Sequence, residues 1–241
     1  MRLGTLFFRR MHAWVGLIVG LQIILWTVSG AAMAFIDMQQ VKGGPRPEAP
    51  PPPALSAAGS AWEAVRASLG DTPVSAVTVR PLLDRQVLEV GTPGGVRLYD
   101  AATGASVRID ARIAAAVAAA GHPEAAKPVR AEPLRELTLA VRRHELPIWR
   151  VDFADDANSV YYVSAETGKL LERRNDSWRW WDFFWMLHNM DYVSRESFNH
   201  PLIVVAAITA AWLALTGLWL LFRTAWRPDI RALRNAFERQ R

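Results

Sequence analysis

The sequence predicts a two-span α-helical membrane protein with an external α+β domain between the spans. Two charge-free apolar stretches lie near the ends of the 241-residue chain, at 11–36 and 201–222. Each exceeds the roughly 20 residues that a helix needs to cross the hydrocarbon core of a bilayer. The more polar residues between them contain an internal repeat with the pattern of β-strands. We therefore expect a folded domain that is held at a membrane surface.

The first transmembrane helix is predicted over 11–36, after a short basic segment at 1–10. A basic start, an apolar run and the small residues of 31–34 also resemble a cleaved signal peptide. The apolar run is longer than that of a typical signal peptide, and Gln22 and Ser29 suit a packed helix. An uncleaved span is therefore the preferred interpretation.

The distribution of charge predicts the orientation of both helices. The segments 1–10 and 223–241 carry nine arginines and two acids, a net charge of +7, whereas the whole chain carries +5. The residues between them therefore carry −2. Because arginine-rich flanks stay on the cytoplasmic side, we expect both termini in the cytoplasm and the central domain in the periplasm, at the bacterial inner membrane. The basic pI thus reflects the flanks of the spans, and no nucleic-acid partner is predicted.

A proline-rich linker is predicted over 37–56, and the periplasmic domain over 57–176. The linker contains four consecutive prolines, which favour a stiff and extended chain. Within the domain, 96–104 aligns with 160–168 at an offset of 64 residues, and each copy ends in Thr-Gly. Glycine at this place suits a backbone with positive φ.

Each copy of the repeat follows a second strand-like segment and helix-like segments. The strand-like segments are 86–90 and 148–153; the helix-like segments are 60–69 in the first unit, and 110–120 with 134–143 in the second. A helix followed by antiparallel strands, repeated twice, predicts an α+β domain of two similar units. The chain has no cysteine, which excludes disulfides and cysteine-ligated metals.

The last part of the chain is predicted to contain an interfacial helix, a second span and a basic tail. The segment 177–198 is dense in tryptophan and phenylalanine, which is typical of a helix at the membrane–water interface. The second transmembrane helix is expected over 199–222. The arginine-rich tail at 223–241 is expected to lie as a helix on the anionic inner leaflet, so membrane lipid is a predicted partner.

Several short motifs occur along the chain in the order typical of one protein family. The motifs within the predicted spans and beside them are Arg10-Met11-His12-Ala13-Trp14-Val15-Gly16-Leu17, Ser29-Gly30, Leu187-His188 and Leu215-Thr216-Gly217-Leu218-Trp219. With the strand pair 146–153 and 160–168, which resembles a PepSY module, they resemble the PepSY-associated transmembrane family. The resemblance covers nearly the whole chain. It implies haem-linked electron transfer, and in some members reduction of ferric siderophores, although many members have four or more spans.

Three histidines are candidate cofactor ligands. His12 begins a stripe of small residues in the first span that includes Gly16 and Gly20, and His200 begins a similar stripe in the second. Such stripes allow close helix packing, or they leave room for a flat macrocycle; both interpretations stay open. Under the second interpretation we expect haem b, with His12 and His200 as first axial ligands and His188 as the next.

The positions of these histidines predict more than one chain per haem. His12 and His200 lie at opposite ends of antiparallel helices, so they cannot ligate the same iron. His12 would pair with its copy in a homodimer, or with a group on a partner membrane subunit. His188 and His200 offer a second site at the outer end.

The remaining histidines and motifs limit the functions that the chain could have. His122 and His144 lie in polar segments, and both are expected at the surface. No glycine-rich dinucleotide turn is present, so no nicotinamide or flavin is predicted, and electrons would come from a quinol or a redox partner. The protein would then be a component of a haem-dependent reductase. The alternative function is a non-enzymatic PepSY binding or regulatory module, or an accessory subunit of a larger membrane complex.

Overall fold

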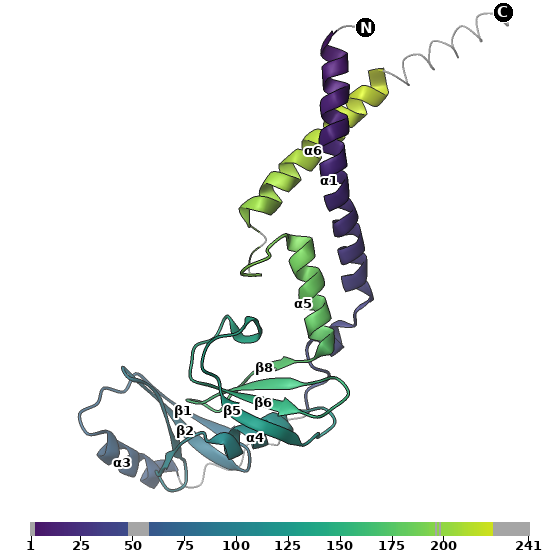
Figure 1. The fold of residues 1–241 in the computed structure, drawn as a ribbon. Helices are drawn as coiled ribbons and strands as arrows, with labels where there is room; N and C mark the ends of the chain where they lie inside the picture. Colours follow the sequence, from purple (N-terminus) through teal and green to yellow (C-terminus); the bar gives the residue numbers. More distant parts are fainter. Residues whose placement is uncertain (1–2, 48–57, 196, 198, 224–241) are drawn as a thin grey trace, which may run out of the picture. The chain divides into compact units, whose positions relative to one another are not determined.

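The computed structural model describes residues 3–47, 58–195, 197 and 199–223, which form two compact units (Figure 1). The first, called the helical unit, contains α1 (Leu3–Phe35), the part of α5 (Asp176–Asn189) from Trp181 onward, and α6 (Pro201–Leu221). The second, called the sheet unit, contains Ile36–Trp180.

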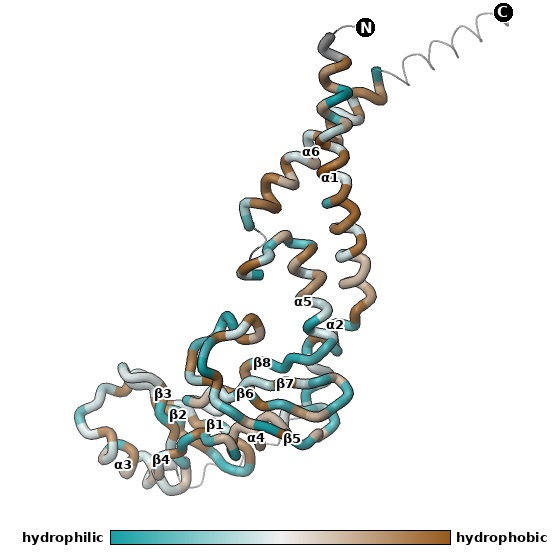
Figure 2. Tube along the Cα trace, viewed as in Figure 1, coloured by the Kyte–Doolittle hydropathy of each residue, from teal (hydrophilic) through white to brown (hydrophobic). Residues whose placement is uncertain are grey.

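Two helices are long and apolar enough to cross a membrane. Among the described residues, the apolar parts of these helices are Leu6–Phe35 in α1 and Pro201–Leu221 in α6. Figure 2 shows both helices as predominantly hydrophobic. Most of their large apolar side chains are exposed, which is the arrangement expected of helices surrounded by lipid. α1 begins within the predicted N-terminal segment, so its first two turns precede the expected span.

One face of α1 is protected within the helical unit, and α6 crosses this helix (Figure 1). The protected residues recur at intervals of three and four, as on one side of a helix; they include His12, Gly16, Val19, Trp26, Ser29 and Gly30. Gly16 lies against Leu213 of α6, where a Cβ would be 3.8 Å from the leucine side chain. The rings of Phe8 and Trp219 meet edge to face at 5.7 Å.

The sheet unit contains two four-stranded antiparallel sheets, each with its strands in sequence order. The first consists of β1 (Ala76–Leu82), β2 (Arg85–Thr92), β3 (Gly95–Asp100) and β4 (Ser106–Val107). The second consists of β5 (Pro128–Pro133), β6 (Ile148–Phe153), β7 (Val160–Ser164) and β8 (Leu170–Arg174). The predicted α+β domain of two helix-plus-strand units is confirmed.

Each sheet is covered on both faces. The helix α3 (Ala58–Leu69) buries Ala61, Val65 and Leu69 against one face of the first sheet. The other face shares one core with α4 (Ala111–Ala120) and the second sheet. The residues of this shared core include Leu82, Val87, Leu98, Ile109, Ala114, Ala118, Val151 and Tyr161. The two sheets therefore form one body and not two independent modules.

The internal repeat corresponds to β3 and β7 with their following turns. Gly104 has φ +71° and Gly168 has φ +69°, as the Thr-Gly pattern predicts. Each glycine N–H donates to a carbonyl four residues earlier, that of Asp100 or Ser164, at 2.8 Å. The positive φ is required at both turns, because a residue with Cβ is strained in this conformation.

Two expectations about the sheet unit are wrong. The segment 134–143 is not a helix and contains only the 3₁₀ turn η1 (Leu139–Val141). Leu134 N–H donates to Ile148 O at 2.8 Å, so the pairing of β5 with β6 extends into the segment where a helix was expected. His122 is not at the surface: it is only 4% exposed, and its Nε2 lies 3.0 Å from Asp155 Oδ2. A neighbouring aromatic core encloses the imidazole, with Phe153 at 4.8 Å.

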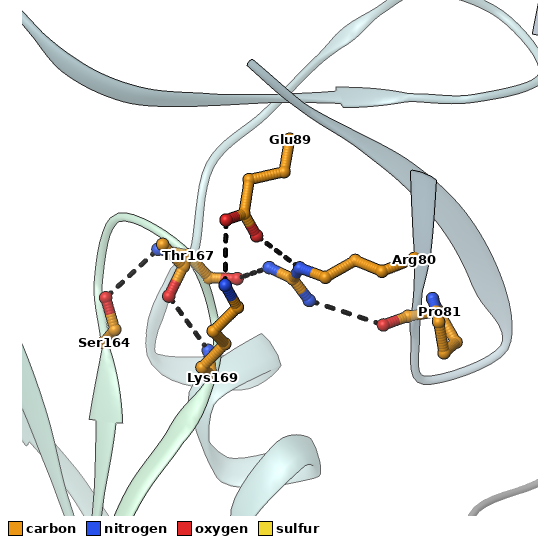
Figure 3. Close-up of polar contacts among 6 residues, drawn as sticks. All are labelled: Arg80, Pro81, Glu89, Ser164, Thr167 and Lys169. Carbon is orange, nitrogen blue, oxygen red and sulfur yellow. Dashed lines mark hydrogen bonds and ion pairs between the residues drawn. The ribbon is translucent and has the colours of Figure 1, made fainter. Parts of the chain in front are cut away.

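A cluster of charges joins the two sheets (Figure 3). Glu89 of β2 accepts from Arg80 Nε of β1 at 2.5 Å and from Lys169 Nζ at 2.8 Å. Arg80 also donates to the carbonyl oxygen of Thr167, in the β7–β8 turn. Because Thr167 and Lys169 lie in the turn between β7 and β8, this cluster ties β1 and β2 of the first sheet to the second sheet.

The first residues of the sheet unit pack on the end of the second sheet. Asn175 Nδ2 donates to Gln40 O in α2 (Met38–Val41) at 2.7 Å, and Asn175 Oδ1 accepts from Trp178 N at 2.8 Å. The buried Arg173 donates to Gly44 O at 2.9 Å. This arrangement fixes the start of the predicted linker, whereas 48–57 lies outside the described residues.

Candidate functional site

His12 lies on the protected face of α1 and contacts α6. Its Nδ1 is 2.9 Å from Thr216 Oγ1. The Thr216 hydroxyl donates its own proton to a carbonyl of the preceding turn, that of Trp212 at 2.9 Å or Leu213 at 3.0 Å. With its proton directed to that carbonyl, the hydroxyl oxygen accepts from His12, and Nδ1 then carries the imidazole proton of the neutral ring.

The glycine after Thr216 allows this close approach. A Cβ at Gly217 would lie 3.0 Å from His12 Cε1 and 3.5 Å from Nε2. A larger residue would require the imidazole to shift by a few tenths of an ångström. Thr216 and Gly217 thus form a cradle in which the ring packs closely against α6.

His188 of α5 has the same environment, supplied by α1. Its Nδ1 is 3.2 Å from Ser29 Oγ, and the Ser29 hydroxyl donates to Leu25 O at 2.6 Å. A Cβ at Gly30 would lie 3.3 Å from His188 Cε1. The helical unit therefore contains two cradles of one hydroxyl and one glycine, and each holds one histidine.

This arrangement prepares both rings for metal ligation through the other nitrogen. A neutral imidazole whose Nδ1 donates a hydrogen bond has its lone pair on Nε2. Protein ligands of metals commonly have their second ring nitrogen fixed in this way by an outer partner. In this neutral tautomer, His12 and His188 both have the lone pair of Nε2 available for a ligand.

His200 has a different local role. It is the N-cap of α6, and its Nδ1 accepts from Leu202 N–H at 3.3 Å. In the neutral ring this leaves the proton on Nε2, the opposite tautomer to that of His12 and His188. Gly20, the other predicted cofactor-binding glycine, has open space around the position of a Cβ.

The candidate ligands are far apart along the helical unit. Seventeen residues of α1 separate His12 from Ser29, the partner of His188, which corresponds to about 25 Å along a helix. Among the residues that the structure describes, no three His, Cys, Asp or Glu side chains gather as they would around a bare metal ion. Each cradle holds one histidine, and the two histidines contact different levels of α1.

The end of α5 that belongs to the helical unit is rich in aromatic side chains, as predicted from 177–198. The rings of Trp181 and Trp185 stack at 4.9 Å, and Phe183 is exposed. On another face of this helix, the buried Asp182 accepts from Arg195 at 2.5 Å. This ion pair fixes the chain that follows α5.

Sequence reasoning named the three histidines but not the hydroxyl partners. Ser29 and Thr216 are visible in the sequence as Ser/Thr-Gly pairs inside apolar helices. Their role depends on which histidine faces them, which only the packing of α1, α5 and α6 determines. The sequence signal that could have identified these partners was a serine or threonine directly before a glycine within each span.

The structure defines a class of membrane-anchored α+β protein, in which two apolar helices accompany a pair of similar antiparallel sheets. The family described as PepSY-associated TM region matches residues 9–241. The chain therefore belongs to the PepSY-associated transmembrane family and is a membrane-associated PepSY protein. No curated protein and no solved structure gives a significant match to the chain.

Proposed function

We propose that this protein transfers electrons through haem b at the bacterial inner membrane. The observation that carries the proposal is the matched pair of cradles, in which Nδ1 of His12 and of His188 each contacts a hydroxyl and Nε2 is the nitrogen left for a ligand. The sheet unit would lie in the periplasm, where it would serve reduction of an external substrate such as a ferric siderophore. No residue is assigned to that reduction itself.

The chemistry of the two cradles fits haem better than it fits a bare metal ion. A porphyrin supplies its own four nitrogen ligands, so the protein needs to add only axial ligands, and imidazole is a common one. Haem bound at these imidazoles would supply one-electron redox chemistry. The protein would contribute the ligand nitrogen, the fixed ring orientation and the apolar surroundings. Gly20 leaves open space on α1 that a macrocycle could use, whereas Gly16 is covered by Leu213 of α6.

A homodimer would complete the ligation. His12 and His188 lie at different depths along α1, so one chain supplies one imidazole to each site. A second copy related by a two-fold axis would add the equivalent histidine at the same depth. A partner membrane subunit is the other source. His200 stays the third candidate ligand, although binding through its Nε2 would require the opposite tautomer.

The first test is a visible difference spectrum of the purified protein, dithionite-reduced minus air-oxidised. We expect a b-type α band in the wild type, and its loss or reduction in His12→Ala and His188→Ala. His144→Ala is the matched control, since His144 bonds Glu172 in the sheet unit at 3.0 Å. A well-folded protein that shows no haem band after expression with ample haem would contradict the proposal.

Substitution of the hydroxyl partners tests how the histidines are prepared. Thr216→Val keeps the shape of the side chain but removes the oxygen that accepts from His12, whereas Thr216→Ser retains it. Outer partners of metal ligands typically contribute 10- to 100-fold to affinity. We therefore expect haem affinity to fall by about that factor in the valine variant and to recover in the serine variant. Equal affinity in all three proteins would show that Thr216 does not position the ligand.

A binding or regulatory module is the second candidate function, and a groove in the sheet unit favours it. β4 pairs with β3 only at Leu98 and Tyr99, so the outer edge of β3 is unpaired at 95–97 among the described residues. A groove of about 500 Å³ lies beside this edge and includes Arg97 and Arg108. An extended peptide could add to such an edge as a further strand.

Substitutions in the groove separate the two functions. Arg97→Glu should weaken capture of a periplasmic partner if the sheet unit is the functional surface, and it should leave any haem band unchanged. Conversely, His12→Ala should then be tolerated. If the phenotype changes in His12→Ala and is unchanged in Arg97→Glu, this second function is ruled out.

A further inference from the structure

Two hydrogen-bond donors within α1 are buried without a partner. They are the side-chain Nε2 of Gln22 and the indole Nε1 of Trp26, for which no acceptor exists among the described residues. Both lie within the candidate membrane span. A buried donor without an acceptor is costly, and in hydrocarbon no bulk water can satisfy it. These atoms therefore indicate that a group with acceptor atoms belongs beside them.

The two donors form a pair on one face of α1. Gln22 and Trp26 are four residues apart, so one side chain lies about 6 Å above the other along the helix. This stretch of α1 lies between His12 and the cradle residue Ser29. The donor pair and the His188 site thus follow one another on the same helix.

A third unpartnered side chain follows His188 directly. Asn189 is only 1% exposed, and both its Oδ1 and its Nδ2 lack a hydrogen-bond partner among the described residues. A buried carboxamide offers one acceptor and one donor group. The helical unit therefore holds unused donors on two helices, and an unused acceptor on the residue that follows His188.

We propose that the headgroup of an isoprenoid quinone binds in the helical unit, against the Gln22–Trp26 face of α1. A quinone carries two carbonyl oxygens on opposite sides of one ring, and these would accept from the donors of α1. In the quinol form, hydroxyl groups replace the carbonyls, and Asn189 Oδ1 could accept from one of them. The inference identifies the electron donor of the proposed haem function, and only its biological purpose rests on that function.

The neighbouring surface suits the tail of such a ligand. Leu21 and Ile24, which flank Gln22 on α1, are both exposed and apolar. An isoprenoid chain leaving the headgroup would therefore remain in contact with an apolar helix surface and lipid. A water molecule could satisfy single donors but would make no use of the adjoining apolar surface.

The test is a binding titration of the full-length protein in lipid nanodiscs with decyl-ubiquinone as the probe, followed by calorimetry. Trp26→Phe removes the indole N–H and retains an aromatic ring. Loss of one neutral hydrogen bond corresponds to about fivefold weaker binding. Trp14→Phe is the matched control on the same helix, because Trp14 is 70% exposed. Gln22→Leu should weaken binding similarly, without a change in the amount of folded protein.

The outcomes distinguish this inference from the proposed function. Saturable binding that weakens in Trp26→Phe and Gln22→Leu but not in Trp14→Phe supports the site. No saturable binding to the wild type, or equal binding to all variants, overturns it. A haem band without quinone binding would support the haem function and contradict the quinone site. Quinone binding without any haem band would support the quinone site and contradict the haem function.

Discussion

Replacement of Glu89 by glutamine tests whether one carboxylate joins the two sheets. The Glu89 side chain is 17% exposed and accepts from Arg80 and Lys169. A hydrogen bond to a charged group contributes about 1.5–3 kcal/mol when it is shielded from water. Lys169 is 52% exposed, so its share is about 0–1 kcal/mol. Because glutamine retains one acceptor oxygen, we expect a loss of about 2 kcal/mol in the free energy of unfolding.

The effect should depend on pH with a defined sign. Burial raises the pKa of Glu89, but hydrogen bonds from Lys169 and Arg80 outweigh it, so the pKa lies below the ordinary value of 4.5. The folded-state pKa is therefore lower than the unfolded-state pKa. The stabilisation is fully present above the ordinary value and disappears as the pH falls through the folded-state pKa. The difference between wild type and Glu89→Gln should shrink over that acidic range.

The measurement is thermal unfolding of the full-length protein in detergent, followed by near-ultraviolet circular dichroism between pH 7 and pH 3. A loss of 2 kcal/mol corresponds to a decrease in Tm of about 4–8 °C for a unit of this size. Lys169→Met is the comparison variant and should lower stability by about 0.5 kcal/mol. Equal losses in the two variants, or a Glu89→Gln effect independent of pH, would refute the reasoning.

Two further predictions concern the sheet unit. Gly104→Ala should destabilise it by about 3 kcal/mol, because φ is positive and the new Cβ would lie 2.7 Å from a carbonyl of α3. Gly70→Ala has positive φ but open space and should cost only about 1 kcal/mol; equal losses in urea unfolding would contradict this. Asp155→Asn should cost about 2 kcal/mol near neutral pH and less in acid. Burial raises the pKa of Asp155, but hydrogen bonds from Ser159 and His122 leave it below its ordinary value. A loss that grows on acidification would oppose this assignment.

The most regular features of the sheet unit were predictable from local sequence. The repeat at 96–104 and 160–168 combines strand-forming residues with a Thr-Gly turn, and both halves of that pattern are set by local backbone preference. Asp110 similarly marks the start of α4, since its side chain accepts from Ile113 N at 2.8 Å. The two apolar helices were predictable from the length and hydropathy of their sequences alone.

Edge strands and buried polar groups were not predictable in the same way. β5 begins and ends with proline and contains charged residues, so it lacks the alternation that marks a strand; its pairing with β6 comes from the tertiary fold. His122 lies in a polar sequence, and its burial depends on Asp155, which is 33 residues later in the chain. Local composition contains no information about such distant partners.

The candidate site was predictable only in its residue types. His12 and His188 stood out as histidines next to apolar helices. The identity of the hydrogen-bond partner, and therefore of the ring nitrogen that stays unprotonated, depends on the rotation of each helix about its axis. Hydropathy does not determine that rotation, because both α1 and α6 are apolar around most of their circumference.

The contact of Arg173 with Gly44 joins the first and last segments of the sheet unit, so it can form only after the strands between them have been synthesised. The segment 37–45 contacts the end of the second sheet through Arg173 and Asn175. The whole first sheet is nevertheless synthesised before the second sheet. The arginine that holds this segment emerges 129 residues after the glycine it binds. During translation the segment around Gly44 therefore has no Arg173 to bind until β8 has been synthesised. Truncation before residue 173 would therefore remove the end of β8 and would also leave Gly44 without the arginine that binds it.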